Sequence, residues 1–357
     1  MDIKTRCIAT AIGSLPHPDA GKALDVILGA IPDAPIWPQL PKLGMREQME
    51  IQYSEGLPRV VIDEVKQRMS FDTTGDCSEE LSGFYEGYMA AEESGDYSVA
   101  AISAAFSAGI PALEARLKSL GRKAPFIKVQ VTGPLSFALT IVDQDKRAIY
   151  YNEEFADVVV KNAAMKARWQ VAKFKPYAEN VICFIDEPIL SAFGSSTYVS
   201  VQRDDVVKKL NEVIEAVHAE GALAGIHCCG NTEWSILVDA GVDILNFDAF
   251  DFGETIGLYP EHMKRHLLEC GNAIAWGVVP TSPAIRNETA ESLVGRFEKA
   301  AGNLAQKTGI DPAVIAAQAI ITPSCGTGSM EVADAERVFA LLGETSRALR
   351  AKHGFNN

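Results

Sequence analysis

Two residues near the middle of the chain have the types and the spacing of metal ligands. His227 and Cys229 lie in LAGIHCCGNTEW, residues 223–234, where an apolar run ends and the chain turns on Gly-Asn-Thr. Side chains two apart on a strand point to the same side, so an imidazole and a thiolate could converge on one ion. Free cysteine is also a common core residue. This pair alone therefore leaves metal binding and simple packing open.

Two other apolar runs end in groups of the same kind. Asp248 ends VDILNFD, and Cys325 lies in ITPSCGTG, just before a glycine turn. An imidazole, two thiolates and a carboxylate form a mixed ligand set that suits Zn²⁺. We therefore expect a zinc site made of His227, Cys229, Asp248 and Cys325.

The remaining cysteines carry a weaker signal. The chain has seven cysteines, an odd number spread along its length, which does not indicate a disulfide framework. Strand alternation points Cys228 away from its two neighbours, so we expect it in the core, together with Cys7 and Cys183. Cys77 and Cys270 allow no prediction.

Polar groups at two further strand ends are candidates for substrate binding. Asp186 and Glu187 end VICFIDEP, where a buried carboxylate is costly unless a cationic group or hydrogen-bond donors meet it. A helix-capping or ion-paired acid is the alternative interpretation. Ile12, Gly13 and Ser14 form a turn in AIGSLP whose backbone N–H groups could receive a carboxylate.

The elements that must position these residues read as repeated βα units around a parallel sheet. Eight is the number of strands that closes a (β/α)8 TIM barrel, in which catalytic groups lie at the C-terminal strand ends. We expect these eight strands at 7–13, 35–39, 126–133, 181–188, 223–229, 242–248, 273–279 and 319–325.

Helical periodicity is clearest late in the chain, at 204–221, 289–309 and 334–354, each ending on a glycine. Residues 40–125 are too many for one βα connection and carry helical patterns at 45–68 and 111–121. We expect an elaborated insertion after the second strand of one barrel domain spanning 1–357, with an independent subdomain as the alternative. Residues 45–58 could form either a lid over the barrel mouth or a packed helix.

Composition limits the classes of partner. The 357 residues include 33 Lys plus Arg against 47 Asp plus Glu, a net charge of −14, which would repel nucleic acid and anionic membranes. The N-terminus lacks the apolar stretch of a signal peptide, and no window has 18 uninterrupted apolar residues. We expect a cytoplasmic protein that acts on a small molecule, without nucleic-acid or membrane partners.

The chain carries five short motifs: IGS at 12–14, TGP at 132–134, IDEP at 185–188, H-x-C at 227–229 and P-x-C-G at 323–326. Together they resemble, in order and spacing, the catalytic C-terminal barrel of cobalamin-independent methionine synthase. The resemblance covers nearly the whole chain, and residues 227–248 also resemble the uroporphyrinogen decarboxylase-like superfamily, which includes zinc methyltransferases that move methyl groups from corrinoids to thiols. No counterpart of the large N-terminal barrel is present, so the resemblance implies a core-only form.

The resemblance implies roles for the candidate residues. His227, Cys229 and Cys325 would be zinc ligands, and Asp248 stands where the long family has a glutamate ligand. The turn 12–14 would hold the homocysteine carboxylate, and Asp186 would hold its amino group. A second family glutamate that contacts the amino acid falls near Leu43, which leaves the identity of the thiol open.

Three departures from the family concern the methyl donor. Thr140 stands where the family stacks folate on a tryptophan, Ala192 where a glutamate contacts folate, and Thr281 where a histidine supplies a proton. Methyl-tetrahydrofolate holds its methyl group on a tertiary amine that must be protonated to leave, whereas a methylcorrinoid needs no such acid. We therefore expect methylcobalamin or a methylated corrinoid protein as the donor.

The sequence thus predicts a zinc-dependent thiol methyltransferase that makes methionine from homocysteine. A corrinoid-dependent enzyme acting on another thiol, such as coenzyme M, is the nearest alternative. A uroporphyrinogen decarboxylase needs no zinc and relies on an Arg-rich N-terminal segment, while this chain has only Arg6 before Arg46. A corrinoid-binding or zinc-storage module would bind without transferring a methyl group.

Overall fold

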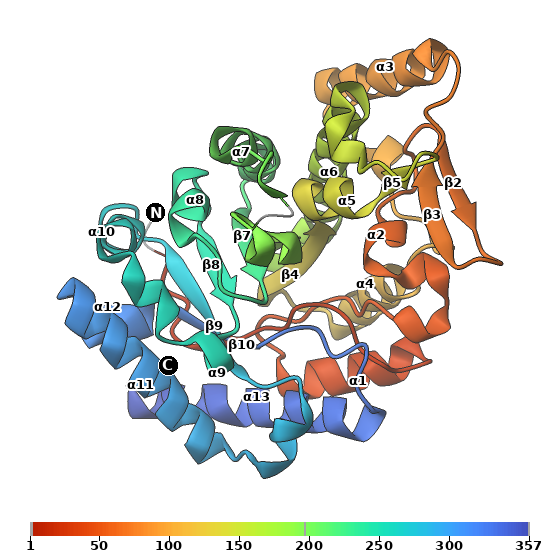
Figure 1. Ribbon diagram of the computed structural model, residues 1–357. Coiled ribbons are helices and arrows are strands. Elements are labelled where there is room, and N and C mark those ends of the chain that lie inside the picture. The colour runs from red at the N-terminus through yellow and green to blue at the C-terminus, as the bar shows by residue number, and fades with distance from the viewer. Residues whose placement is uncertain (1–2, 196–197, 356–357) are drawn as a thin grey trace.

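The chain is an α/β protein built on a curled sheet of parallel strands (Figure 1). The structure is a computed structural model that describes residues 3–195 and 198–355. Within these residues the main sheet has seven strands in the order β1-β10-β9-β8-β7-β6-β4, and every neighbouring pair is parallel. The strands are β1 (Ile8–Ala9), β4 (Ala124–Thr132), β6 (Ala178–Asp186), β7 (Leu223–Cys228), β8 (Ile244–Phe247), β9 (Ala273–Val279) and β10 (Ala319–Pro323).

The expected second strand, residues 35–39, is not a regular strand, so the prediction of eight strands was wrong by one. This segment makes isolated parallel bridges from Ile36 to Lys128 of β4 and from Gln39 to Ser14 after β1. Two prolines, Pro35 and Pro38, have no N–H to donate to a ladder, which explains why pairing stays discontinuous. The seven-stranded sheet is consistent with a TIM-barrel-like fold. Residues 35–39 lie between its two edge strands, β1 and β4.

Side chains alternate between two hydrophobic clusters along each strand, as the pleat requires. One small cluster lies inside the curled sheet, and its members include Ile8, Ile182, Phe184, Ile244, Ala275 and Ile320. Residues one position away belong to the large cluster under the helices, among them Val129, Cys183, Ile185, Ile226, Cys228 and Trp276. The core positions expected for Cys7, Cys183 and Cys228 are confirmed.

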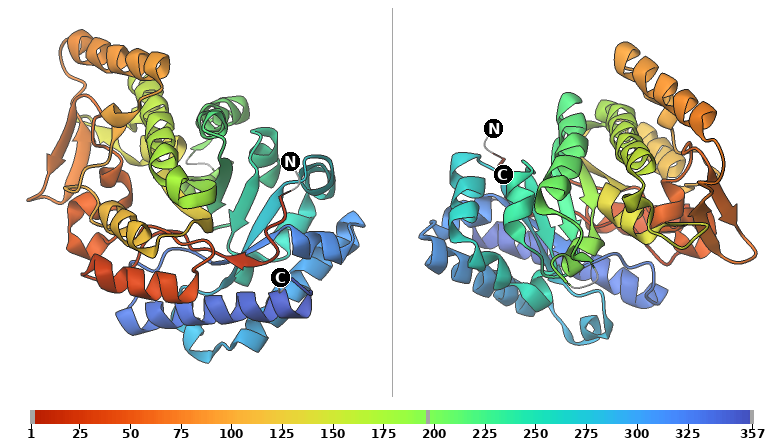
Figure 2. Two further views of the ribbon diagram at one scale, coloured as in Figure 1. Left: turned by 180° about the vertical axis from the view of Figure 1, so that it is seen from behind. Right: turned by 45° about the horizontal axis from the view of Figure 1, so that its top comes forward.

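Helices cover the outer face of the sheet. In Figures 1 and 2, α1, α11 and α13 lie on one side, and α6 and α7 pack together on another. The three helices expected late in the chain are confirmed as α7, α11 and α13, each followed by a glycine with positive φ. None of the helices in the described residues is long and apolar enough to cross a membrane. The helices outside residues 40–125 are α1 (Ala20–Ala30), α5 (Pro134–Thr140), α6 (Glu153–Phe174), α7 (Arg203–Ala219), α8 (Trp234–Asp239), α9 (Ala249–Phe252), α10 (Pro260–Lys264), α11 (Ala290–Thr308), α12 (Pro312–Ala317) and α13 (Val332–Lys352).

Residues 40–125 form helices and a small second sheet. Helix α4 (Gly109–Leu120) confirms the pattern at 111–121, while the helical pattern at 45–68 holds only as far as α2 (Met49–Gln52). Beyond it, β2 (Val60–Asp63) and β3 (Arg68–Phe71) form an antiparallel hairpin that β5 (Val142–Asp143) extends. The β-branched run at 60–62 favours a strand and explains the correction. Helix α3 (Ser78–Ser94) lies beyond this hairpin, at the upper edge of Figure 1.

The segment 45–58 is packed against the end of β4. The Thr132 hydroxyl donates to the Met49 carbonyl (2.8 Å), and the Tyr53 hydroxyl donates to the Gln130 carbonyl (2.6 Å). Tyr53 is 3% exposed. The segment is therefore packed in this structure, with α2 as its one α-helical part, and a lid role stays a prediction.

A buried histidine should make stability depend on pH. His266, in the π-helical turn after α10, is fully buried with Nε2 3.0 Å from the Ala273 carbonyl, and burial lowers its pKa to about 4. Between that value and the ordinary 6.5, the unfolded chain binds a proton that the folded protein does not. The free energy of unfolding should therefore fall as pH drops through this window, by up to roughly 1.4 kcal/mol per pH unit from this residue. Denaturant unfolding from pH 7 to pH 4 should give a shallower fall for His266→Gln, and equal slopes would contradict the assignment.

Candidate metal centre

Three of the expected ligands come together at the C-terminal ends of the strands. One ligand atom from each of His227, Cys229 and Cys325 lies within 4.8 Å of the others. His227 is on β7, Cys229 directly follows it, and Cys325 follows β10. Three strand spacings separate β7 from β10, which would be roughly 14 Å in a flat sheet. The curl of the sheet and the turn after β10 therefore create the cluster.

A hydrogen bond from His227 to Asn246 sets which nitrogen of the histidine is free. The Asn246 amide nitrogen donates to the Ala275 carbonyl (2.9 Å) and the Thr322 hydroxyl (2.8 Å), so its oxygen must face His227 Nδ1, 2.6 Å away. His227 Nδ1 then carries the proton, and Nε2 presents a lone pair. Nε2 is buried and has no hydrogen-bond partner. An unpartnered, correctly oriented nitrogen beside two sulfurs is the arrangement of a metal site with its supporting hydrogen bond in place.

The two sulfurs share one proton. The Cys325 thiol, and then the neighbouring His227 side chain, hold the pKa of Cys229 well below its usual range. The hydrogen bond to Cys229, together with burial, raises the pKa of Cys325. A divalent ion would replace that proton and satisfy both thiolates. This donor set of one nitrogen and two sulfurs fits Zn²⁺.

Asp248 does not join the group of three. Its Oδ1 accepts hydrogen bonds from the backbone N–H groups of Phe250 (2.9 Å) and Asp251 (3.0 Å), so it caps α9. Burial raises its pKa. Zinc ligation by Asp248 stays a prediction.

Asp186 is an almost buried carboxylate beside the cluster. It ends β6 directly opposite His227 in the parallel register, and its Oδ1 is buried without a hydrogen-bond partner. Burial raises the pKa of Asp186, while the Lys128 ammonium and then His227 lower it. Because burial without a hydrogen-bond partner disfavours the charged form, a cation that binds here would compensate the carboxylate.

Glu187 is occupied by the protein itself. Its oxygens accept from the backbone N–H groups of Leu135 (2.9 Å) and Ser136 (2.7 Å) and from the Ser136 hydroxyl (2.7 Å). A Cβ on Gly133 would lie 2.1 Å from the Glu187 carboxyl carbon, so the glycine leaves room for this contact. Burial raises the pKa of Glu187 to about 7. Glu187 caps α5, which was the alternative interpretation, and its contact with substrate stays a prediction.

The turn at 12–14 lies against the loop that carries Cys325. The Ser14 carbonyl accepts from both the N–H and the hydroxyl of Thr327 (2.8 Å each), and the Ser14 hydroxyl accepts from the Gly328 N–H (3.2 Å). A Cβ on Gly326 would lie 2.2 Å from the Ser14 hydroxyl. The first and last strands thus present their loops as one surface next to the cysteines.

Sequence reasoning missed three residues inside the sheet. Asn246, Lys128 and Thr322 sit at inward positions of apolar runs, where a charged or amide side chain is unusual. The signal was available, because FIKVQ and DILNFD both place a polar residue at an inward position of a strand. The partners of these polar residues, which the sequence does not give, show what each one holds in place.

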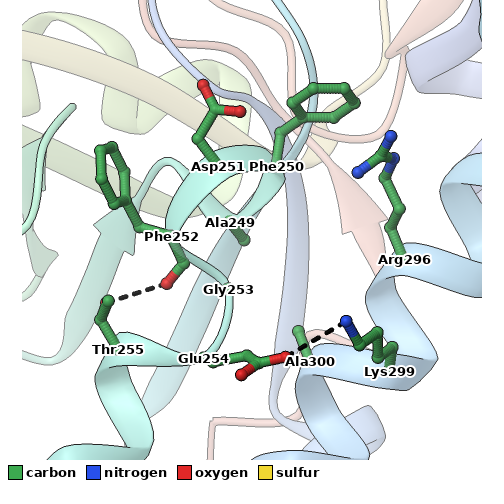
Figure 3. Close-up of a pocket in the computed structure, with 10 residues that line it drawn as sticks. All are labelled: Ala249, Phe250, Asp251, Phe252, Gly253, Glu254, Thr255, Arg296, Lys299 and Ala300. Carbon is green, nitrogen blue, oxygen red and sulfur yellow. Dashed lines mark hydrogen bonds and ion pairs between the residues drawn. The ribbon is translucent and has the colours of Figure 1, made fainter.

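A separate surface hollow lies beside α9. It has a volume of about 240 Å³, and none of the three clustered residues lines it. Figure 3 shows the Phe250 ring beside the Arg296 guanidinium and an ion pair between Lys299 and Glu254. Two of its charged groups, Lys299 and Glu254, are paired with each other, and Arg296 is paired with Glu288. We assign it no role.

Comparison with known proteins shows a shared fold. No protein-family model and no curated protein matches the chain. Among solved structures, a methyltransferase from Methanosarcina mazei aligns over 98% of both chains with 16% identity and a TM-score of 0.51. A candidate vitamin-B12-independent methionine synthase from Listeria monocytogenes aligns over 97% of both chains with 11% identity and a TM-score of 0.55. At these identities the likeness establishes the fold and leaves the activity to the site.

Removing the partner of His227 should weaken metal binding. Asn246→Leu takes away the acceptor that holds Nδ1–H, so the ring is free to turn or change tautomer. We expect zinc affinity to fall roughly 10- to 100-fold. Competition with a chromophoric chelator measures this, with circular dichroism to show that the variant is folded. Unchanged affinity in a folded variant would remove Asn246 from the site.

Substitutions of the two neighbouring carboxylates, Glu187 and Asp186, should have different effects on the free energy of unfolding. Glu187→Ala leaves two buried N–H groups of α5 without an acceptor and should lower the free energy of unfolding by about 1–3 kcal/mol. Asp186→Asn removes a buried charge with an unpartnered oxygen and should not destabilise the protein. Urea unfolding of the two variants measures both effects. The opposite ranking would contradict the assignment of Glu187 as a cap.

Proposed function

We propose that the chain is a zinc-dependent thiol methyltransferase of the core methionine synthase type. In this proposal it transfers a methyl group from a methylcorrinoid to homocysteine and produces methionine. The observation that carries it is the convergence of His227, Cys229 and Cys325 with the His227 Nε2 lone pair unpartnered. The shared fold with a methyltransferase supports the same reading.

Bound zinc would supply Lewis acidity that keeps a substrate thiol deprotonated, and therefore nucleophilic, at neutral pH. Catalytic zinc sites have three protein ligands and one open position. His227, Cys229 and Cys325 provide three, so the fourth position would be available to the substrate sulfur.

Two neighbouring groups would orient an amino-acid thiol. The Asp186 carboxylate, with its unpartnered oxygen, would receive the substrate ammonium. The turn of Ile12, Gly13 and Ser14, held against the Cys325 loop, would receive the substrate carboxylate through backbone N–H groups. Together they would fix the sulfur relative to the incoming methyl group.

The donor is inferred from the absence of an acid in the expected place. The resemblance aligns Thr281 with a family histidine, and the Thr281 hydroxyl lies 3.0 Å from the hydroxyl of Ser324, the residue before Cys325. This contact supports a place for Thr281 near the cluster. A threonine hydroxyl is too weak an acid to protonate a leaving amine. With a methylcorrinoid, the thiolate sulfur forms the new S–C bond as the Co–C bond breaks, and the electron pair stays on cobalt, so no proton is needed.

Product formation tests the proposal directly. Zinc-loaded protein is incubated with homocysteine and either methylcobalamin or methyl-tetrahydrofolate, and methionine is measured by mass spectrometry. We expect methionine from methylcobalamin only, lost in Cys325→Ala and kept in Cys270→Ala, which changes an exposed cysteine away from the cluster. Turnover with folate would contradict the donor assignment. If neither donor gives methionine, the substrate is a thiol other than homocysteine. The exposed Leu43 side chain, which stands in place of a family glutamate, also favours that alternative.

A further inference from the structure

Lys128 is a fully buried lysine to which the proposed function gives no role. It lies on β4, and its side chain is inside the curled sheet with 0% exposed. Its ammonium donates to the Ile12 carbonyl and to Gln130 Oε1 (3.2 Å) and stands 4.7 Å from the centre of the Phe184 ring. Burying an ammonium is costly unless partners compensate it, so these contacts require an explanation.

The contacts of Lys128 converge on the turn at 12–14. Lys128 holds the Ile12 carbonyl, and the Gln130 amide lies under Gly13, where a Cβ would be 2.9 Å from Gln130 Nε2. The Gly13 carbonyl accepts from the Gln39 N–H (3.0 Å). The turn therefore rests on a platform made by Lys128 and Gln130.

The platform determines which way the turn faces. In a trans peptide the C=O and the N–H point in opposite directions. Lys128 lies four residues before the end of β4 at Thr132, which is deeper than the strand ends. With the Ile12 carbonyl held by Lys128, the N–H of the same peptide, that of Gly13, points away from the lysine. Cys229 and Cys325 follow the C-terminal ends of β7 and β10, and the turn itself follows the C-terminal end of β1.

The residues around Lys128 also bring its positive charge close to Asp186. The Phe184 ring can lie beneath the lysine because residue 225 is glycine, where a Cβ would be 2.4 Å from that ring. Asp186 is two residues after Phe184 on β6, so both side chains lie on the same face of the sheet. Among the charged groups, Lys128 lowers the pKa of Asp186 most. Lys128 thus places a positive charge near Asp186, which lies beside the two cysteines of the cluster.

We propose that Lys128 is a positioning residue that directs the backbone N–H groups of the Ile12–Ser14 turn at the carboxylate of an amino-acid thiol. The lysine acts through the turn and does not touch the substrate. It makes the site selective for thiols that carry a carboxylate. The inference rests on the proposed function, because it assumes that an amino-acid thiol binds at this metal centre.

Thiol binding to cobalt-loaded protein tests the inference without requiring methyl transfer. Co²⁺ reports thiolate coordination through an absorption band, which gives a Kd for each thiol. Homocysteine is compared with 3-aminopropane-1-thiol, the same molecule without its carboxylate. We expect wild type to favour homocysteine and Lys128→Met to reduce that preference about tenfold, the loss of one charge-supported contact. The change should come from weaker binding of homocysteine alone.

Lys166 provides a matched control. It is the second fully buried lysine among the described residues, its Nζ lies 3.3 Å from the Ala100 carbonyl, and burial lowers its pKa to about 8, as it does for Lys128. It is on α6, outside the sheet. Lys166→Met should keep the wild-type preference, so a general cost of removing a buried lysine is separated from an effect on the turn.

The outcomes are distinct. If Lys128→Met weakens both thiols equally, or neither, the positioning role is overturned. If that variant fails to fold, Gln130→Met removes the other half of the platform and should reduce the preference in the same direction, while an unchanged ratio overturns the inference. If wild-type cobalt protein shows no band with either thiol, the proposed function itself fails, and this result is distinguishable from a loss of selectivity.

Discussion

The candidate metal centre depends on the curl of one parallel sheet. His227 and Cys229 belong to β7 and Cys325 follows β10, so no local segment could bring the three together. Alternation within each strand then decides which residues reach the inside. It places Cys228 under the helices and its two neighbours at the metal centre, a division that a shift of one residue in register would reverse.

Inside the sheet, polarity increases toward the C-terminal ends of the strands. Aliphatic residues such as Ile182 and Ile244 fill the lower part, together with Lys128, which pairs in register with Ile182. The Lys128 ammonium is matched to the Ile12 carbonyl, and the Asn246 oxygen is matched to His227. Nearer the strand ends, His227 Nε2 and Asp186 Oδ1 are buried without a hydrogen-bond partner, and in our proposal they face the substrate. Buried polar atoms without a partner are expected where a bound ligand supplies the missing interaction.

The sequence predicted the parts that depend on periodicity and on strand ends. The βα alternation, the three late helices and the convergence of His227, Cys229 and Cys325 all follow from spacing along the chain. Strand 35–39 could not be judged from its apolar residues, because its prolines interrupt the ladder. The roles of Glu187 and Asp248 could not be predicted in this way. Each accepts hydrogen bonds from N–H groups at the start of a helix, and which helix start lies near a carboxylate depends on the tertiary structure.

The position of Cys325 has a consequence for when a metal ion could bind. This third residue of the cluster follows the last strand of the sheet in chain order, and the helix after it, α13, packs on β1 and β10. During synthesis on the ribosome, His227 and Cys229 therefore emerge well before Cys325. A nascent chain would offer an incomplete donor set, so stable metal binding would have to wait until β10 has emerged and paired with β1.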